Sequence, residues 1–190
     1  MQFKQHTNLD NQHAFLSPSK YHWVNYDIEK LDLVFGKWQS QIRGIRLHEF
    51  ACTAIRLGIK LPNTKQTLNQ YVNDAIGFRM KTEQVLYYSE NCFGTADAID
   101  FRKDLLRIHD LKTGNTTASI TQLEIYAALF CLEYHYKPKD IKTELRLYQS
   151  NNIIVNNYEI DPELPETIET VMEKIILFDK RIDEIKCEEL

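Results

Sequence analysis

The sequence predicts an α/β or α+β fold with a central mixed β-sheet flanked by helices. Three observations support this: helical periodicity in residues 38–80, three short apolar runs between residues 83 and 114, and a helix–hairpin–helix order afterwards. The chain contains no repeat, low-complexity tract or linker. We therefore expect one domain over residues 1–190.

The composition is that of an ordinary globular protein of 190 residues, with 43% hydrophobic and 26% charged residues. No apolar run approaches the roughly 20 residues that span a bilayer, and the N-terminus lacks a signal-peptide pattern. We expect a cytoplasmic protein without a membrane partner. The net charge of −4 argues weakly against a nucleic-acid-coating protein, but residues 1–80 carry ten basic against six acidic residues.

The first third of the chain predicts an arm followed by two helices. Residues 1–36 are expected to form an irregular N-terminal arm anchored by Tyr21, Trp23 and Tyr26, because a Ser-Pro turn signal precedes these aromatic residues. Apolar spacing predicts one helix from about Trp38 to Gly58 and a second from Thr67 to Met80.

After residue 80, the spacing of apolar residues changes from a helical pattern to short apolar runs, and this change predicts the remaining elements. Residues 83–90, 93–101 and 105–114 predict three neighbouring strands, and residues 119–136 predict a helix. Asn151-Asn152 separates two further runs as in a hairpin. Residues 163–187 predict a C-terminal amphipathic helix with acidic residues in its first turns.

The stretch HDLKTG, residues 109–114, raises the question of chemistry. Asp110 and Lys112 are two apart on a predicted strand and so share one face. If the preceding strand pairs with this one through a turn near Lys103-Asp104, Asp97 falls opposite Asp110. Two carboxylates with Cβ atoms about 5 Å apart repel unless a cation compensates. A divalent metal such as Mg²⁺ is the usual compensation.

Four motifs together resemble the PD-(D/E)XK nuclease superfamily. They are GIRLH (44–48), GTAD (94–97), DLKTG (110–114) and QLEIY (122–126), in this order. The chain looks like a small phage-type member of the RecB-type exonuclease branch, and the resemblance covers residues 38–160. It implies a restriction-endonuclease-like core, with the aromatic arm and the acidic C-terminal helix unaccounted for.

The resemblance implies a role for each matching residue. The catalytic residues would be Asp97, Asp110 and Lys112. The metal ligands would be His48, Asp97, Asp110 and the backbone carbonyl of Leu111, holding Mg²⁺ or Mn²⁺. Gln122 and Tyr126 would contact the substrate or support the acids. Arg43 and Arg46 flank the motif helix and could contact phosphates or simply be solvated charges.

An iron–sulfur cluster is not expected. The four cysteines are scattered without a CxxC pair, and Cys187 stands alone near the C-terminus, whereas the iron–sulfur members of this branch carry a closely spaced C-terminal cysteine group.

The predicted function is that of a metal-dependent DNA nuclease, most simply an exonuclease, acting in DNA recombination, repair or phage DNA processing. DNA is the expected partner, and a homo-oligomer or a recombination protein are further partners that the sequence leaves open. The alternative is a non-catalytic binding protein that keeps the nuclease fold, such as a recombination accessory or an inhibitor of a host defence. Intact Asp97, Asp110 and Lys112 weigh against that alternative.

Overall fold

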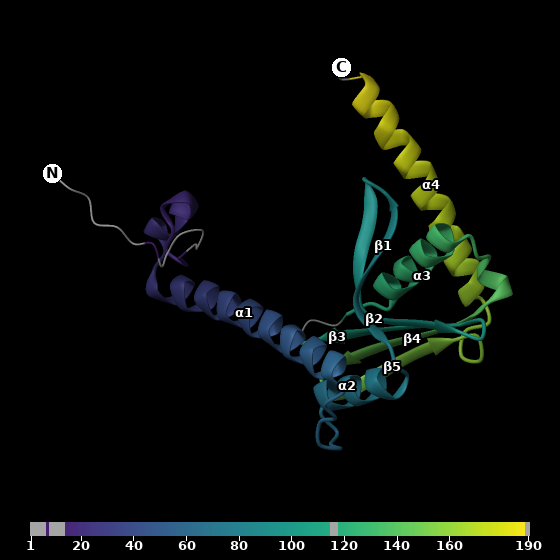
Figure 1. The fold of residues 1–190 in the computed structure, drawn as a ribbon. Coiled ribbons are helices and arrows are strands. Elements are labelled where there is room, and N and C mark those ends of the chain that lie inside the picture. The colour runs from purple at the N-terminus through teal and green to yellow at the C-terminus, as the bar shows by residue number, and fades with distance from the viewer. Residues whose placement is uncertain (1–6, 8–13, 115–117, 189–190) are drawn as a thin grey trace. The chain divides into compact units, whose positions relative to one another are not determined.

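The computed structural model describes Thr7, residues 14–114 and residues 118–188 (Figure 1). Internal contacts divide the chain into two compact units, residues 1–46 and residues 47–190, and the single domain that the sequence predicted stays a prediction. The boundary falls inside a single long helix, α1 (Ile28–Leu57).

The first unit is more helical than the irregular arm that the sequence predicted. A 3₁₀ helix, η2 (Pro18–Asn25), precedes α1, and α1 begins at Ile28, ten residues before the predicted start at Trp38. The Asp27 carboxylate accepts a hydrogen bond from the Lys30 backbone N–H at 2.7 Å, which caps the helix. The rest of the predicted arm, residues 1–6 and 8–13, lies outside the described residues.

The second unit contains a five-stranded mixed sheet in the order β1-β2-β3-β4-β5. The strands are β1 (Lys81–Ser89), β2 (Cys92–Arg102), β3 (Leu105–Lys112), β4 (Lys142–Gln149) and β5 (Asn152–Asn157). All neighbours are antiparallel except β3 and β4, which are parallel and are connected through α3 (Thr121–Tyr134). The α+β class, the mixed sheet and the predicted strands are therefore confirmed.

Two tight turns fix the register of the sheet. Lys103 and Asp104 join β2 to β3, and both have φ above +50°. Ser150 and Asn151 join β4 to β5 with similar angles. Positive φ at both loop residues is the signature of the two-residue type I′ hairpin, whose twist matches that of the strands.

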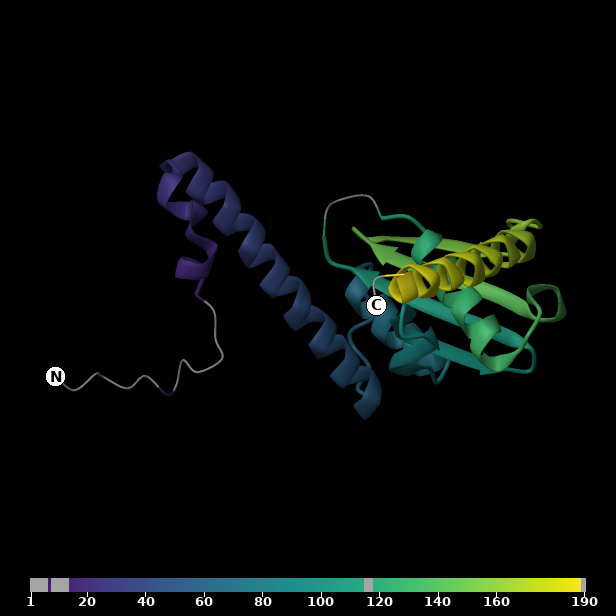
Figure 2. The same ribbon diagram turned by 90° about the horizontal axis from the view of Figure 1, so that it is seen from above.

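Helices cover both faces of the sheet (Figures 1 and 2). Helix α2 (Thr67–Gly77) and residues 51–55 of α1 pack on one face, where Val72, Ala75, Leu111 and Tyr148 are buried. Helix α3 packs on the other face over Leu106 and Ile108, and α4 (Leu164–Glu188) begins against α3. Strand β3 is therefore buried from both sides.

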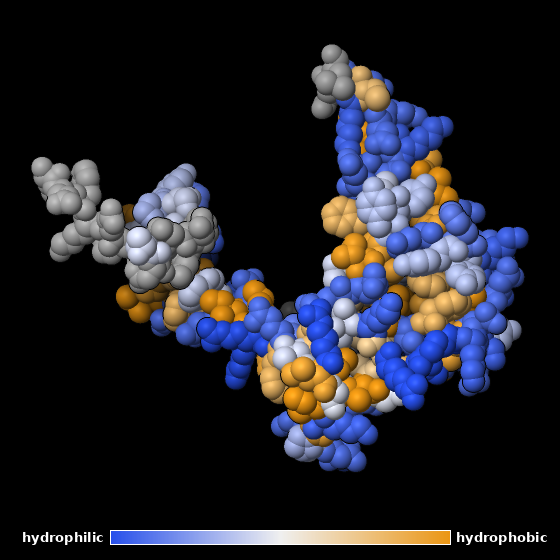
Figure 3. Space-filling view, viewed as in Figure 1, coloured by the Kyte–Doolittle hydropathy of each residue, from blue (hydrophilic) through white to orange (hydrophobic). Residues whose placement is uncertain are grey.

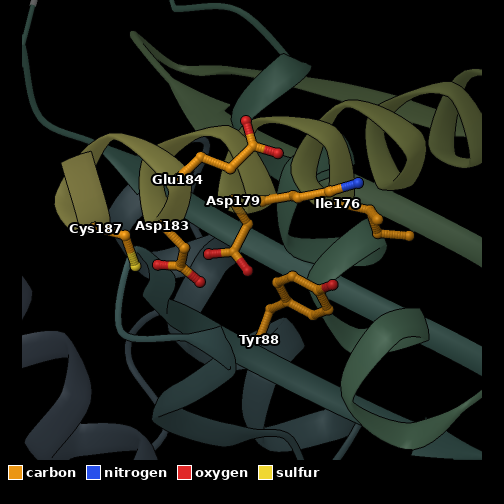
Figure 4. A pocket seen from close by; sticks show the side chains of 7 residues that line it. Tyr88, Ile176, Asp179, Asp183, Glu184 and Cys187 are labelled. Carbon is orange, nitrogen blue, oxygen red and sulfur yellow. The ribbon is translucent and has the colours of Figure 1, made fainter.

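The C-terminal half of α4 is less covered than its beginning. Together with β1 it lines a hollow of about 510 Å³, in which Tyr88 faces the acidic side chains of Asp179 and Asp183 (Figure 4). Apolar side chains also remain exposed along α4, among them Leu177 and Phe178, and near the C-terminal end of α1 (Figure 3). Within the described ranges, no helix combines the length and the apolarity needed to cross a bilayer.

Candidate active site

Asp97 and Asp110 lie side by side on neighbouring strands, as the sequence predicted. The Lys103-Asp104 turn sets Phe101 opposite Leu106 and Ala98 opposite His109, and continuing this register by one position would set Asp97 opposite Asp110. The Leu111 backbone N–H donates a hydrogen bond to Asp97 Oδ2 at 3.1 Å. Asp110 is only 2% exposed, whereas the Asp97 side chain is a quarter exposed. One acid is thus buried in the central strand, and the other faces outward beside it.

Lys112 neutralises the buried acid. Its Nζ donates a hydrogen bond to Asp110 Oδ1 at 3.1 Å and lies 2.9 Å from Oδ2. The same ammonium donates to Gln122 Oε1 on α3 at 2.6 Å. Lys112 is therefore held between the strand that carries the acid and the helix that covers it, with part of its side chain still exposed.

A hydrogen-bonded chain continues from Gln122 to β2. Gln122 Nε2 donates to the Tyr126 hydroxyl at 3.3 Å, and that hydroxyl donates to the Thr95 carbonyl at 2.7 Å. The two α3 residues are four apart and so lie on one helix face. The Tyr126 ring needs the bare backbone of Gly94, because a Cβ at this position would lie 3.0 Å from Tyr126 Cε1. This packing gives the glycine of GTAD a steric role.

His48 reaches the outer acid from α1. Its Nδ1 lies 3.4 Å from Asp97 Oδ2, and its side chain is about one third exposed. The structure thus links His48 to Asp97, and Lys112 to Asp110 and Gln122. All six side chains that the motifs predicted in residues 47–190 therefore contact at least one other member of the set.

Burial raises the pKa of Asp97 above its ordinary value, and the neighbouring Asp110 charge raises it further. His48, the Leu111 N–H and Lys112 act in the opposite direction. The sequence did not indicate that Tyr71, a buried residue of α2, lies near these acids. Burial raises the pKa of Tyr71 well above its ordinary value, and the charges of Asp97 and Asp110 raise it further. No motif contains Tyr71, so only the packing of α2 on the sheet brings it close to the acids.

The donor atoms at this site fit a divalent cation in type. Asp110 Oδ2 is buried and accepts no hydrogen bond despite its proximity to the Lys112 ammonium, and burial, followed by the like charge of Asp110, raises the pKa of Asp97. Carboxylate oxygens with one imidazole suit Mg²⁺ or Mn²⁺. The donors are not gathered into a ready cage, however: in the part of the chain that the structure describes, no group of three or more His, Cys, Asp or Glu residues could hold a metal ion.

The roles of three further contributors stay predictions. Arg43 and Arg46 belong to the first unit, where both are exposed. The Leu111 side chain is buried in the cluster under α2, and the role of its carbonyl as a metal ligand stays a prediction. The role of the Leu111 carbonyl rests on the resemblance, and the roles of Arg43 and Arg46 rest on their position beside the motif helix.

Comparison with known proteins gave no match of the chain to a family model, a curated protein or a solved structure. The arrangement of the site residues must therefore support any functional assignment.

Proposed function

We propose that the chain is a metal-dependent deoxyribonuclease with a PD-(D/E)XK site of the RecB type. The observation that supports the proposal best is the proximity of Asp97, which accepts a hydrogen bond from the Leu111 N–H, to Asp110 on the adjacent strand, with Lys112 held between Asp110 and Gln122. Two acids and a lysine in this relation are suited to hydrolysing a phosphodiester bond, because the reaction needs a cation at the phosphate and a group that directs water.

His48, Asp97, Asp110 and the Leu111 carbonyl would hold the cation. A bound Mg²⁺ or Mn²⁺ would lower the pKa of the attacking water and neutralise charge on the phosphate. Two observations support this assignment: burial and the like charge of Asp110 raise the pKa of Asp97, and Asp110 Oδ2 accepts no hydrogen bond.

Lys112 would orient water or stabilise the negative charge that develops on the phosphoryl oxygens. Its ammonium can do this only if it is kept at the edge of the site, and the 2.6 Å hydrogen bond to Gln122 Oε1 provides that restraint. Tyr126 fixes Gln122 in turn through its own bond to the Thr95 carbonyl. Gln122 and Tyr126 would therefore position Lys112 in addition to meeting the DNA strand.

Exonuclease action is the proposed mode, because the branch that the motifs resemble works on DNA ends. The proposed setting is the cytoplasm, or the host cytoplasm if the chain is phage-encoded, in recombination, repair or processing of phage DNA. A recombination protein or a second copy of the chain would be a partner there.

The test is cleavage of linear and circular DNA, single- and double-stranded, with Mg²⁺ or Mn²⁺. Asp110→Asn and Lys112→Gln should each abolish or nearly abolish cleavage. Asp104→Asn and Lys103→Gln are matched controls, because they make the same changes in the turn of the same hairpin, and they should cleave like the wild type. Full cleavage by both site variants would overturn the proposal. Cleavage of circles would assign endonuclease action.

A non-catalytic binding protein with the same fold is the second candidate. One observation favours it: no preassembled group of three metal-binding side chains is present in the described ranges. Calorimetric titration with Mn²⁺ separates the two candidates. Heat of binding that disappears in Asp110→Asn supports the nuclease, whereas no binding by the wild type supports the binding protein.

A further inference from the structure

The first unit contains a cavity that the proposed nuclease site does not use. It has a volume of about 240 Å³, and residues 15–26 and the first half of α1 line it. Among the residues that the structure describes, its lining combines aromatic rings with two ammonium groups and contains no acidic side chain. The aromatic residues are Phe15, Trp23, Tyr26 and Trp38, and the cations are Lys20 and Lys37.

The aromatic rings are fixed in place but incompletely covered. Trp23 Nε1 donates to the Ser17 carbonyl at 3.0 Å, and Trp38 stacks on Phe35 with ring centroids 5.4 Å apart. Trp23, Tyr26 and Trp38 are nevertheless only partly buried, and no apolar side chain in residues 14–46 is fully buried. Part of their aromatic surface thus stays available to a flat ligand.

The cations of the cavity have no acidic partner among the described residues. Neither Lys20 nor Lys37 forms an ion pair with any residue that the structure describes. Trp38 also borders a second hollow on α1, where Arg43 and Arg46 supply two further positive charges and again no acid is present. Positive charge therefore borders Trp38 in both hollows, although the whole chain carries a net charge of −4.

We propose that this aromatic and cationic cavity binds single-stranded nucleic acid. Bases would stack on the rings of Trp23, Tyr26 or Trp38, and the flanking phosphates would meet Lys20 and Lys37. An unpaired base has both of its faces free to stack on an aromatic side chain, whereas bases in a duplex are already stacked on one another. A polyanion also matches a lining with cations and no acids. The inference goes beyond the proposed nuclease function, because it needs neither Asp110 nor a metal.

The chain provides its own probe for this site. It contains two tryptophans, Trp23 and Trp38, and both line the cavity. The experiment titrates the full chain with a short oligothymidylate in the presence of EDTA, so that no cleavage occurs, and follows tryptophan emission. We expect saturable quenching that weakens as salt is raised. The same oligonucleotide annealed into a duplex should quench much less.

Two pairs of substitutions separate the cavity from general charge and aromaticity. Lys37→Gln should weaken binding several-fold, whereas Lys30→Gln, on the same helix but outside the cavity, should not. Tyr26→Ala should weaken binding by roughly tenfold if a base stacks there. Tyr21→Ala is its control, because Tyr21 is 64% exposed and does not line the cavity. Equal effects within either pair would overturn the assignment to this cavity.

The remaining outcomes are equally decisive. Equal quenching by an oligouridylate supports a single-strand site that ignores the sugar, and weaker quenching supports one that selects DNA. A tryptophan signal that depends on protein concentration but not on oligonucleotide would make the cavity a protein contact and refute the proposal, as would no signal change at all. Asp110→Asn should bind as the wild type does, so failure of the nuclease proposal and failure of this one are distinguishable.

Discussion

The Leu111 backbone N–H in β3 donates a hydrogen bond to Asp97 Oδ2 in the neighbouring strand β2, at 3.1 Å. This bond connects the strand of the outer acid to the residue that follows the buried acid. The same carboxyl oxygen lies 3.4 Å from His48 Nδ1. Asp97 is therefore the residue through which α1 and the two central strands meet, and Lys112 performs the corresponding function for Asp110 and α3.

Removal of the lysine charge should separate metal binding from cleavage. Lys112→Gln takes a positive charge away from Asp110, which leaves the acids more attractive to a cation. We expect Mn²⁺ affinity to rise by roughly fivefold, equivalent to about 1 kcal/mol, while cleavage is lost. Calorimetry and a cleavage assay on one preparation measure both quantities. Lys103→Gln should change neither, and weaker Mn²⁺ binding by Lys112→Gln would contradict the proposed arrangement.

Gly94→Ala should displace Tyr126. The added Cβ would lie 3.0 Å from Tyr126 Cε1, so the ring must shift and its bond to the Thr95 carbonyl must lengthen. We expect a loss of unfolding free energy on the order of 1 kcal/mol and slower cleavage. Urea denaturation measures the first effect.

A double-mutant cycle identifies the cause. If the clash with the tyrosine ring is responsible, Gly94→Ala should cost less stability in a Tyr126→Leu background. Gly77→Ala serves as the steric control, because nothing lies within 4 Å of the added methyl group. A cost for Gly94→Ala that does not change with residue 126 would rule out this steric explanation.

Tyr148 should be structural and not catalytic. Its buried hydroxyl donates to Asp74 Oδ2 at 2.7 Å and so links β4 to α2. Tyr148→Phe leaves that carboxylate with one partner fewer, and we expect it to lower the unfolding free energy by about 1–2 kcal/mol. Cleavage at a temperature where the variant is folded should be unchanged. The exposed Tyr158 provides the control, since Tyr158→Phe should alter neither quantity.

The cysteines should differ sharply in reactivity toward a maleimide. Cys187 is exposed and should react first in the native protein. Burial raises the pKa of the Cys131 thiol to about 12, so mildly alkaline pH still leaves it almost entirely protonated and unreactive. Mass spectrometry of labelled peptides measures the extent of labelling at each cysteine. Cys131 should become labelled only in denaturant, and early labelling in the native state would contradict the packing of α3.

The register that forms the site could be predicted because it is local. Lys103-Asp104 defines a two-residue turn, and counting along the strands from it gives the observed pair of Ala98 with His109, next to the two acids, without any knowledge of the rest of the molecule. The bond between Lys112 and Gln122 could not be derived this way, because it depends on how α3 lies across the sheet. The contact of His48 with Asp97 depends likewise on the packing of α1.

The start of α1 was predicted ten residues too late for a physical reason. Helical periodicity is visible when one face is buried, but Ile28 and Leu33 near the start of α1 are both largely exposed. Gly36 interrupts the pattern further, since glycine disfavours helix interiors. The proximity of Tyr71 to the acids was missed because a tyrosine on an apolar helix face looks like any other core residue.

The parallel pairing of β3 with β4 also has a consequence for the order of folding. Strands β1 to β3 are joined by short turns, and so are β4 and β5, whereas the junction between the two sets spans a whole crossover helix. Contacts between segments close in sequence form fastest, because little chain entropy is lost when their loops close. Asp97 and Asp110 can therefore be brought opposite each other early, while Asp110 still faces water. Asp110 then loses its contact with water only when β3 pairs with β4, which is the slowest pairing of the sheet.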